Sequence, residues 1–304
     1  MSNAYIFPGQ GAQFPGMGQE LYETHAKARE YMDQANDILG FDIKSIMFSG
    51  TKEELQQTGV TQTAIFIHSV LAALTSENFA PDMVAGHSLG EYSALCASES
   101  LSLEETAKLL KVRATSMQEA SPKGEGAMAA CIGVSFKDLN DVLDSLVTDG
   151  VCQIANDNVE GQIVISGHEY NVDRVVATLK DTGHKAIKLK VSAPFHSQLV
   201  EKASKPMQNA LDSVEIKAPK TPLLANVTAD LVSDPTIIKQ NLVSQISGTV
   251  RWRETMDKFA ELGITELVEI GSGKVLAGLA KKSPHNFKLK NISNIEELGN
   301  YLAS

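Results

Sequence analysis

A five-residue turn, Gly86-His87-Ser88-Leu89-Gly90, is the feature of this sequence that most constrains its fold. The short, mostly apolar run 82–85 predicts a buried strand before the turn, and the apolar spacing over residues 89–95 predicts a helix directly after it. Such a turn places the serine hydroxyl at the carboxyl edge of a sheet, over a helix N-terminus that favours a negative oxygen. We therefore expect an α/β fold with Ser88 as a nucleophile. The alternative is a tight turn with an incidental serine.

The order of predicted elements divides the chain into a large and a small part. Residues 128–189 follow the order β-α-β-β-α-β, with a polar turn at 156–161, which is the ferredoxin-like split motif. Before and after this stretch, strand and helix patterns of a larger α/β unit are expected. We assign the small subdomain to residues 126–192 and the large domain to residues 1–125 and 193–304.

Composition and charge narrow the class of protein. The chain has 304 residues, 43% hydrophobic, and a formal net charge of −10. An acidic protein is a poor general ligand for nucleic acid or an anionic membrane, so we expect neither as a partner. Three cysteines without a CxxC pair, and an N-terminus without signal-peptide features, favour the cytoplasm. No long amphipathic seam is left over, and we expect a monomer.

Sequence motifs for cofactors and metals are incomplete. Gly9-x-Gly11 is followed by Phe14 where a dinucleotide-binding fingerprint needs glycine. Gly273-Lys274 does not complete a P-loop, because Val268 stands where its first glycine belongs. No HExxH or clustered metal-ligand spacing occurs. We therefore expect no metal and no bound cofactor.

A serine nucleophile needs a base, and a buried arginine needs an anion. Among seven histidines, His196 is the leading candidate for the base, because it lies in an irregular stretch where the chain returns to the large domain. Arg113 lies at the edge of the apolar face of the helix expected at 102–120, which a Ser-x-x-Glu capping box begins. Its guanidinium is suited to a carboxylate, either of a ligand or of an Asp or Glu in this chain.

Together these residues resemble the malonyl-CoA:acyl carrier protein transacylase family, the acyltransferases of bacterial type II fatty acid synthesis. The resemblance covers essentially the whole chain, and the motifs come in the family's order. They are Phe7-Pro8-Gly9-Gln10-Gly11-Ala12-Gln13, Gly86 to Tyr92, Arg113 with Met117-Gln118, Ala155-Asn156 with Gly161-Gln162 and Ser166-Gly167, Pro194-Phe195-His196, Asn226-Val227-Thr228, Val250-Arg251-Trp252 and Gly271 to Leu276.

The resemblance implies an α/β-hydrolase-like core with a parallel sheet and an inserted ferredoxin-like subdomain. It also implies a ping-pong transfer of malonyl from malonyl-CoA, through Ser88, to the phosphopantetheine thiol of acyl carrier protein. Coenzyme A is then part of a substrate and not a cofactor. His196 is implied as general base, and the backbone carbonyl that orients it is assigned to Arg251, where the family often has glutamine.

The remaining site residues follow from the same resemblance. The backbone N–H groups of Gln10 and Leu89 are implied as the oxyanion hole, and Arg113 as the ligand of the malonate carboxylate. Three further side chains are expected beside the substrate, namely Met117, His87 and Phe195. The bulky ring of Phe195 leaves little space for an α-methyl group on the acyl chain.

Other functions fit parts of the pattern. A thioesterase or esterase has the same serine turn and differs only in water access, and a free-standing polyketide acyltransferase has the same chemistry. A catalytically idle module that docks acyl carrier protein is a further alternative. Because carrier proteins are generally acidic, transfer predicts a local basic patch. Its candidates are Lys185, Lys188, Lys190, Lys274, Lys281 and Lys282, which as a solvated lysine face need no partner.

Overall fold

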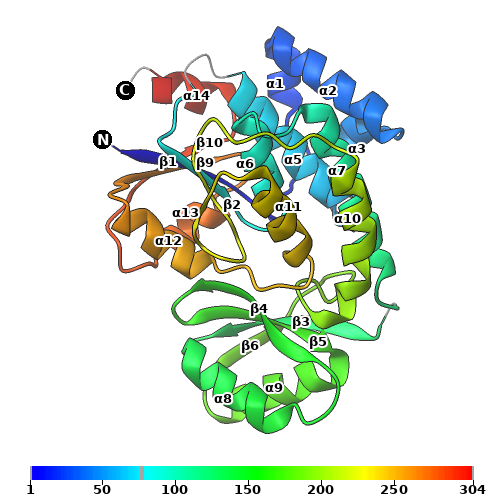
Figure 1. Cartoon of the computed structure of the whole chain (residues 1–304), viewed down its shortest axis with the longest axis vertical. Helices are drawn as coiled ribbons and strands as arrows, with labels where there is room; N and C mark the ends of the chain where they lie inside the picture. The colour runs from blue at the N-terminus through cyan, green and yellow to red at the C-terminus, as the bar shows by residue number, and fades with distance from the viewer. Residues whose placement is uncertain (1, 76–78, 123, 303–304) are drawn as a thin grey trace.

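The computed structural model describes residues 2–75, 79–122 and 124–302 and contains two β-sheets of different kinds. A six-stranded sheet lies among helices, and a four-stranded sheet with two helices lies at the opposite end of the long axis (Figure 1). The molecule is therefore a mixed α/β protein, as the alternation of predicted strands and helices indicates. Within the described ranges, no helix is long and apolar enough to cross a membrane.

The larger sheet has the order β10-β9-β1-β2-β7-β8, and its neighbouring strands are parallel except for β7 and β8. Successive side chains of β1 pack into different hydrophobic cores. Tyr5 and Phe7 belong to the core on one face of the sheet, and Ala4 and Ile6 belong to the core on the other face. This alternation is that of a strand buried on both faces. The strands are β1 Asn3–Phe7, β2 Met83–Gly86, β7 Leu223–Leu224, β8 Leu231–Val232, β9 Glu266–Ile270 and β10 Lys288–Ile292.

Helices cover both faces of this sheet. α5 is buried at every position from Val60 to Ala73 and packs against α2 and α7, whereas α12 carries Trp252 and Phe259 into the core on the opposite face. The helices are α1 Gln19–Thr24, α2 Ala26–Leu39, α3 Ile43–Ser49, α4 Lys52–Leu55, α5 Thr58–Leu74, α6 Gly90–Ala97, α7 Leu103–Glu119, η1 Gln198–Ala203, α10 Ser204–Asp212, α11 Pro235–Ser244, α12 Trp252–Glu261, α13 Val275–Ala280 and α14 Ile295–Leu302.

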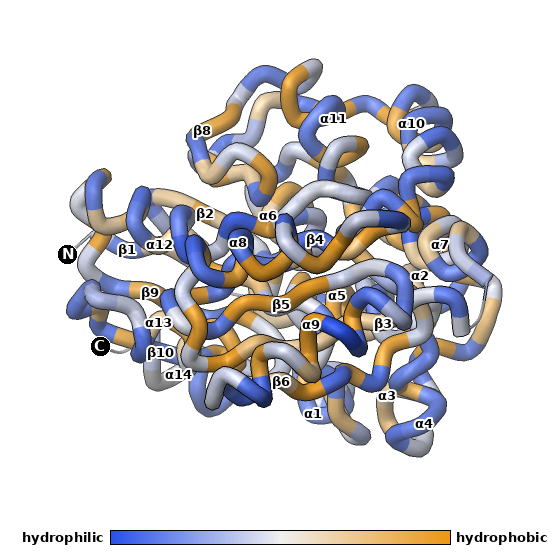
Figure 2. Tube along the Cα trace, turned by 90° about the horizontal axis from the view of Figure 1, so that it is seen from below, coloured by the Kyte–Doolittle hydropathy of each residue, from blue (hydrophilic) through white to orange (hydrophobic). Residues whose placement is uncertain are grey.

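The smaller sheet has the order β4-β5-β3-β6, with antiparallel neighbours throughout. The helices α8 and α9 enclose a separate apolar core with Ile163 and Ile165, while Met128 and Val164 join the main core from the other face. Figure 2 shows a hydrophobic stretch in β5, in agreement with burial on both faces. The elements are β3 Gly126–Ile132, α8 Phe136–Leu146, β4 Cys152–Val159, β5 Gln162–His168, α9 Glu169–Asp181 and β6 Lys185–Lys188.

The strand β4 joins the two parts of the molecule, and here one prediction was wrong. The expected polar turn at 156–161 is strand as far as Val159, because its polar side chains are buried and find partners across the joint. The Asp157 N–H donates to the carbonyl of Val250, and the buried Asp157 carboxylate forms an ion pair with Arg253 of α12 at 2.8 Å. A backbone hydrogen bond and an ion pair thereby hold the small sheet against the large domain.

Replacing Arg253 with methionine should test how much this ion pair contributes. The change leaves the Asp157 carboxylate buried without its cation, and we expect the free energy of unfolding to fall by about 2–3 kcal/mol in urea denaturation. Lys137→Met is the control, because its ion pair with Asp141 is exposed to solvent and should contribute nothing measurable. Equal effects of the two substitutions would contradict a stabilising role for the buried pair.

Candidate active site

The turn around Ser88 is shaped by close backbone packing. Ser88 lies between the end of β2 and the start of α6 and has a φ of 55°, a left-handed value that is strained for a residue with a side chain. A Cβ atom on Gly86 would lie 1.9 Å from the backbone of Gly90, and one on Gly90 would lie 2.2 Å from the carbonyl oxygen of Phe7. Both glycines are therefore required by space, as the sequence pattern predicts.

Asn226 holds this strained turn in place. Its Oδ1 accepts a hydrogen bond from the Ser88 N–H at 2.7 Å, and its Nδ2 donates to the carbonyl of Gly86 at 2.5 Å. The side chain thus bridges the end of the strand and the nucleophile. Sequence reasoning assigned no role to Asn226, although it lies in one of the motifs, because the bond spans 138 positions of the chain.

Ser88 and His196 form a hydrogen-bonded pair. The Ser88 Oγ donates to Nε2 of His196 at 2.7 Å, and His196 itself has a φ of 55°. On the other side of the ring, Nδ1 donates to the main-chain carbonyl of Gln245 at 2.9 Å. Because Nδ1 then carries the proton, Nε2 is free to accept the serine proton. The structure brings together the two residues that sequence reasoning proposed as nucleophile and base.

The assignment of the orienting carbonyl to Arg251 was wrong. The main-chain N–H of Arg251 donates to Asn226, its guanidinium pairs with Glu254, and it lies at the start of α12. The carbonyl that meets His196 belongs to Gln245, six positions earlier, so the glutamine of the family pattern is present after all. A backbone contact carries no side-chain signal, and the sequence interpretation placed it in the nearest distinctive motif.

Burial sets the protonation state of the histidine. Loss of solvent contact, and then the positive charge of Arg113, lower the pKa of His196 to about 3. The imidazole is therefore neutral, and able to act as a base, throughout the neutral and mildly acidic range.

Arg113 is a buried cation whose hydrogen-bond partners are all neutral. Its side chain is 1% exposed, Nη1 donates to Oε1 of Gln62 at 2.7 Å, and Nη2 donates to Oε1 of Gln245 at 2.9 Å and to Ser88 Oγ at 3.0 Å. Nε has no hydrogen-bond partner among the described residues. A structural ion pair, one of the two readings open from sequence, is not formed with any described carboxylate, which leaves the guanidinium available for an anionic ligand.

Ser88 opens into a small cavity between the two parts of the molecule. Its volume is 120 Å³, well below the roughly 300–1,000 Å³ of pockets for drug-sized ligands, so its size suits a short acyl group. Every side chain expected beside the substrate lies there. The lining residues are Gln10, Gln62, His87, Ser88, Leu89, Arg113, Met117, Met128, Asn156, Leu189, Val191, Phe195 and His196.

Two features of this cavity concern the oxyanion hole and the neighbouring histidine. Gln10 and Leu89 both line the cavity, and Leu89 directly precedes the first residue of α6, where helix N–H groups are unpaired. The Nε2 of His87 is hydrogen-bonded to Oδ1 of Asn158 from the small sheet at 2.8 Å. Burial lowers the pKa of His87, so it is a neutral wall of the cavity and not a second base.

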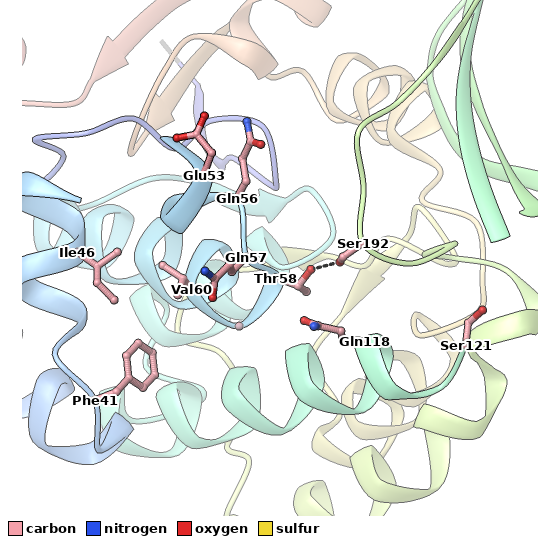
Figure 3. Close-up of a pocket in the computed structure, with 11 residues that line it drawn as sticks. Phe41, Ile46, Glu53, Gln56, Gln57, Thr58, Val60, Gln118, Ser121 and Ser192 are labelled. Atoms are coloured by element: carbon pink, nitrogen blue, oxygen red, sulfur yellow. Dashed lines mark hydrogen bonds between the residues drawn. The ribbon is translucent and has the colours of Figure 1, made fainter. Parts of the chain in front are cut away.

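A second cavity, drawn in Figure 3, has a volume of 710 Å³ and shares no lining residue with the cavity at Ser88. It is formed where α5 begins and α7 ends, and a hydrogen bond between Thr58 and Ser192 lies at its edge. Its one charged lining residue is Glu53, and it contains no pair of nucleophile and base. Among the described residues there is also no group of three or more His, Cys, Asp or Glu side chains that could hold a metal ion.

Comparisons with known proteins agree with this geometry. A family model described as an acyl transferase domain matches residues 4–301. Malonyl CoA-acyl carrier protein transacylase of Bacillus subtilis (strain 168) is 41% identical over 299 residues, which cover 97% of this chain and 94% of that protein. The protein of the same name from Staphylococcus aureus (strain MRSA252) is 38% identical over 297 residues, 97% and 96% of the two chains.

Solved structures also resemble this chain over its whole length. The acyl-carrier-protein-S-malonyltransferase from Bartonella henselae superimposes with a TM-score of 0.97 at 42% identity, over 100% of this chain and 99% of that one. A malonyl-transacylase solved in complex with a type II PKS acyl-carrier protein has a TM-score of 0.96 at 32% identity, over 100% and 99%. The likeness extends over the whole chain and so over both sheets.

The low pKa of His196 predicts an unusual pH profile. The rate at which a neutral fluorophosphonate labels Ser88 should stay level from about pH 8 to about pH 5, because the base loses its free electron pair only as the pH falls toward its pKa. An ordinary histidine, with a pKa of 6.5, would cause the rate to fall about tenfold per pH unit below that value. Circular dichroism at each pH monitors folding, and such a tenfold fall in folded protein would contradict the assignment.

Proposed function

This chain belongs to the malonyl CoA-acyl carrier protein transacylases of the acyl transferase family and transfers malonyl from malonyl-CoA to acyl carrier protein; we propose that it does so through a malonyl ester of Ser88. The observation that carries the mechanism is the buried Arg113, which has only neutral partners and lies 3.0 Å from the serine hydroxyl. A thioester that also carries a carboxylate satisfies both groups at once.

The first half-reaction transfers malonyl to the enzyme. The Ser88 oxygen attacks the thioester carbon while its proton moves to Nε2 of His196. The carbon–sulfur bond then breaks, and His196 returns the proton to the coenzyme A thiolate. The carbonyl of Gln245 stabilises the transient imidazolium, and the N–H groups of Gln10 and Leu89 stabilise the oxyanion.

The second half-reaction reverses these roles. The phosphopantetheine thiol of the carrier gives its proton to His196 and attacks the ester carbon, and the ester oxygen leaves with that proton as the Ser88 hydroxyl. Thioester and serine ester have similar energies, so exclusion of water decides between transfer and hydrolysis. The small cavity and the burial of His196 support transfer over the thioesterase alternative.

In this cycle, Arg113 can donate a hydrogen bond either to the Ser88 hydroxyl or to the malonyl carboxylate. Its Nη2 donates to Ser88 Oγ, and this hydrogen bond engages one of the two electron pairs of the nucleophile. A malonyl carboxylate offers a stronger, charge-assisted partner to Nη2 and to the unpaired Nε. We propose that the substrate thereby frees the serine oxygen. The ring of Phe195, which lines the same cavity, would oppose an α-methyl group.

The setting of the site supports further proposals. The parallel sheet with a serine turn at its carboxyl edge fits an α/β-hydrolase-like core, and the strand order of the small sheet fits a ferredoxin-like subdomain at 126–192. We propose that the enzyme acts as a monomer in the cytoplasm without a metal or bound cofactor. Its product would supply fatty acid synthesis, and polyketide synthesis is the alternative with the same chemistry.

Intact-protein mass spectrometry after brief incubation with malonyl-CoA tests the acyl-enzyme. The wild type should gain the mass of one malonyl group, and Ser88→Ala should gain none. Arg113→Met should malonylate at least about a hundredfold more slowly, because it loses a charge-assisted, bidentate contact. The same variant should still react with a neutral fluorophosphonate, which needs Ser88 and His196 but no carboxylate ligand.

Other outcomes of this measurement would point elsewhere. Consumption of malonyl-CoA without an adduct would indicate a hydrolase. An intact donor without an adduct would indicate a different acyl group or an idle docking module. Equal loss of both reactions in Arg113→Met would contradict carboxylate binding by Arg113.

The carrier-docking face gives a separate prediction. Lys188 is paired with Glu169 and Asp173 and is a weak candidate, whereas Lys281 and Lys282 are exposed beyond α13. Replacing both Lys281 and Lys282 with glutamate should raise the KM for acyl carrier protein by about tenfold, because the carrier is acidic. The KM for malonyl-CoA should not change. Unchanged carrier kinetics would remove this patch from consideration.

A further inference from the structure

Glu91 is a buried carboxylate directly behind the nucleophile. It lies in the first turn of α6, is 1% exposed, and does not line the cavity that contains Ser88. Its Oε2 accepts a hydrogen bond from Nε2 of Gln245 at 2.6 Å and one from the main-chain N–H of Asn226 at 3.2 Å. Glu91 therefore touches both of the residues that hold the serine turn, while remaining out of reach of a substrate.

Gln245 is the second member of this arrangement, and each end of its side chain has a distinct task. Its Nε2 donates to Glu91 and also to the main-chain carbonyl of Ser88 at 3.1 Å, while its Oε1 accepts from Nη2 of Arg113 at 2.9 Å. Its main-chain carbonyl separately orients His196. One residue thus serves the base through its backbone and the arginine through its side chain.

The polarity of the Gln245 amide follows from its neighbours. An amide offers two donors at one end and an acceptor at the other. An ionised carboxylate can only accept, and so can the carbonyl of Ser88, so the nitrogen must face these two groups. The oxygen must then face Arg113, which can only donate. With the amide reversed, a donor would meet the guanidinium and an acceptor would meet Glu91, and both would be buried unpaired.

We propose that Glu91 and Gln245 form a positioning pair that sets the orientation of Arg113, and with it the preference of the site for acyl groups that carry a carboxylate. This inference rests on the proposed function, because it takes Arg113 as the ligand of the malonyl carboxylate. Burial raises the pKa of Glu91 to about 7, and the charge of Arg113 opposes this rise, so both forms of the carboxyl are accessible near neutrality. In either form Oε2 can remain the acceptor.

The proposal predicts a selective defect and not a general one. The contact of His196 uses the main chain of Gln245, which a change of the side chain at 91 leaves in place. The reactivity of Ser88 toward a neutral reagent should therefore persist when Glu91 is replaced. Malonylation should suffer, because it depends on Arg113 as well.

Four variants test the pair in the full-length protein. Glu91→Leu and Gln245→Leu remove the hydrogen bond at similar side-chain volume, and each should lower kcat/KM for malonylation by at least about tenfold, the usual effect of losing a bond to a charged group. In Glu91→Leu, labelling by a neutral fluorophosphonate should change by less than about threefold. Gln245→Leu also loses the hydrogen bond to the Ser88 carbonyl, so it serves only as the reference for the coupling. Glu91→Gln keeps an acceptor oxygen facing Gln245 and should retain most of the malonylation rate.

The double variant Glu91→Leu/Gln245→Leu measures whether the effects of the two substitutions on malonylation are coupled. If Glu91 acts through Gln245, the double variant should be no slower than Gln245→Leu alone. Should Glu91→Leu fail to fold, Glu91→Asp replaces it in the cycle, since it keeps the charge but cannot reach Gln245.

Three results would overturn the proposal. They are multiplied losses in the double variant, equal loss of malonylation and phosphonate labelling in Glu91→Leu, or complete loss of malonylation in Glu91→Gln. A wild type that labels with the phosphonate but never malonylates would instead reject the proposed function.

Discussion

The site is organised around a positive charge that forms no direct ion pair with any described carboxylate. Arg113 is fully buried, and its hydrogen bonds end on the amide oxygens of Gln62 and Gln245 and on the hydroxyl of Ser88. Burying a cation against neutral dipoles is costly, and the arrangement persists only when the surrounding polar groups are fixed. Both glutamine side chains are themselves buried, which restricts them to the rotamers that meet the guanidinium.

A second constraint is the space around the nucleophile. The glycines at 86 and 90 allow the serine turn to lie against β1 at distances that any side chain would prevent. The strained backbone of Ser88 is then secured by Asn226, which comes from a different segment after β7. The base arrives from a third segment, where the chain leaves the small sheet. His196 thus lies beyond the last strand of the small sheet, where the chain re-enters the large domain.

Sequence reasoning could reach what short-range patterns encode. The strand–turn–helix around Ser88 and the capping box of α7 are local, and the capping box is confirmed by both of its hydrogen bonds. Residues whose role depends on distant partners were missed, as with Asn226, Glu91 and the Gln245 side chain. The extended β4 was missed for a related reason: its polar residues look like a turn until Arg253 and His87 are known to lie beside them.

Selecting an acyl group through a buried charge differs from selecting it through the shape of an apolar pocket. An acetyl group would fit the 120 Å³ cavity as easily as malonyl, so its size alone cannot separate them. In the proposed function, a neutral acyl group brings no charge to Arg113, whereas the malonyl carboxylate supplies an anion. Discrimination then comes as much from the penalty on the wrong ligand as from attraction of the right one. The same reasoning explains why the nearest carboxylate, Glu91, is held one amide away from Arg113: in direct contact it would take the place of the substrate.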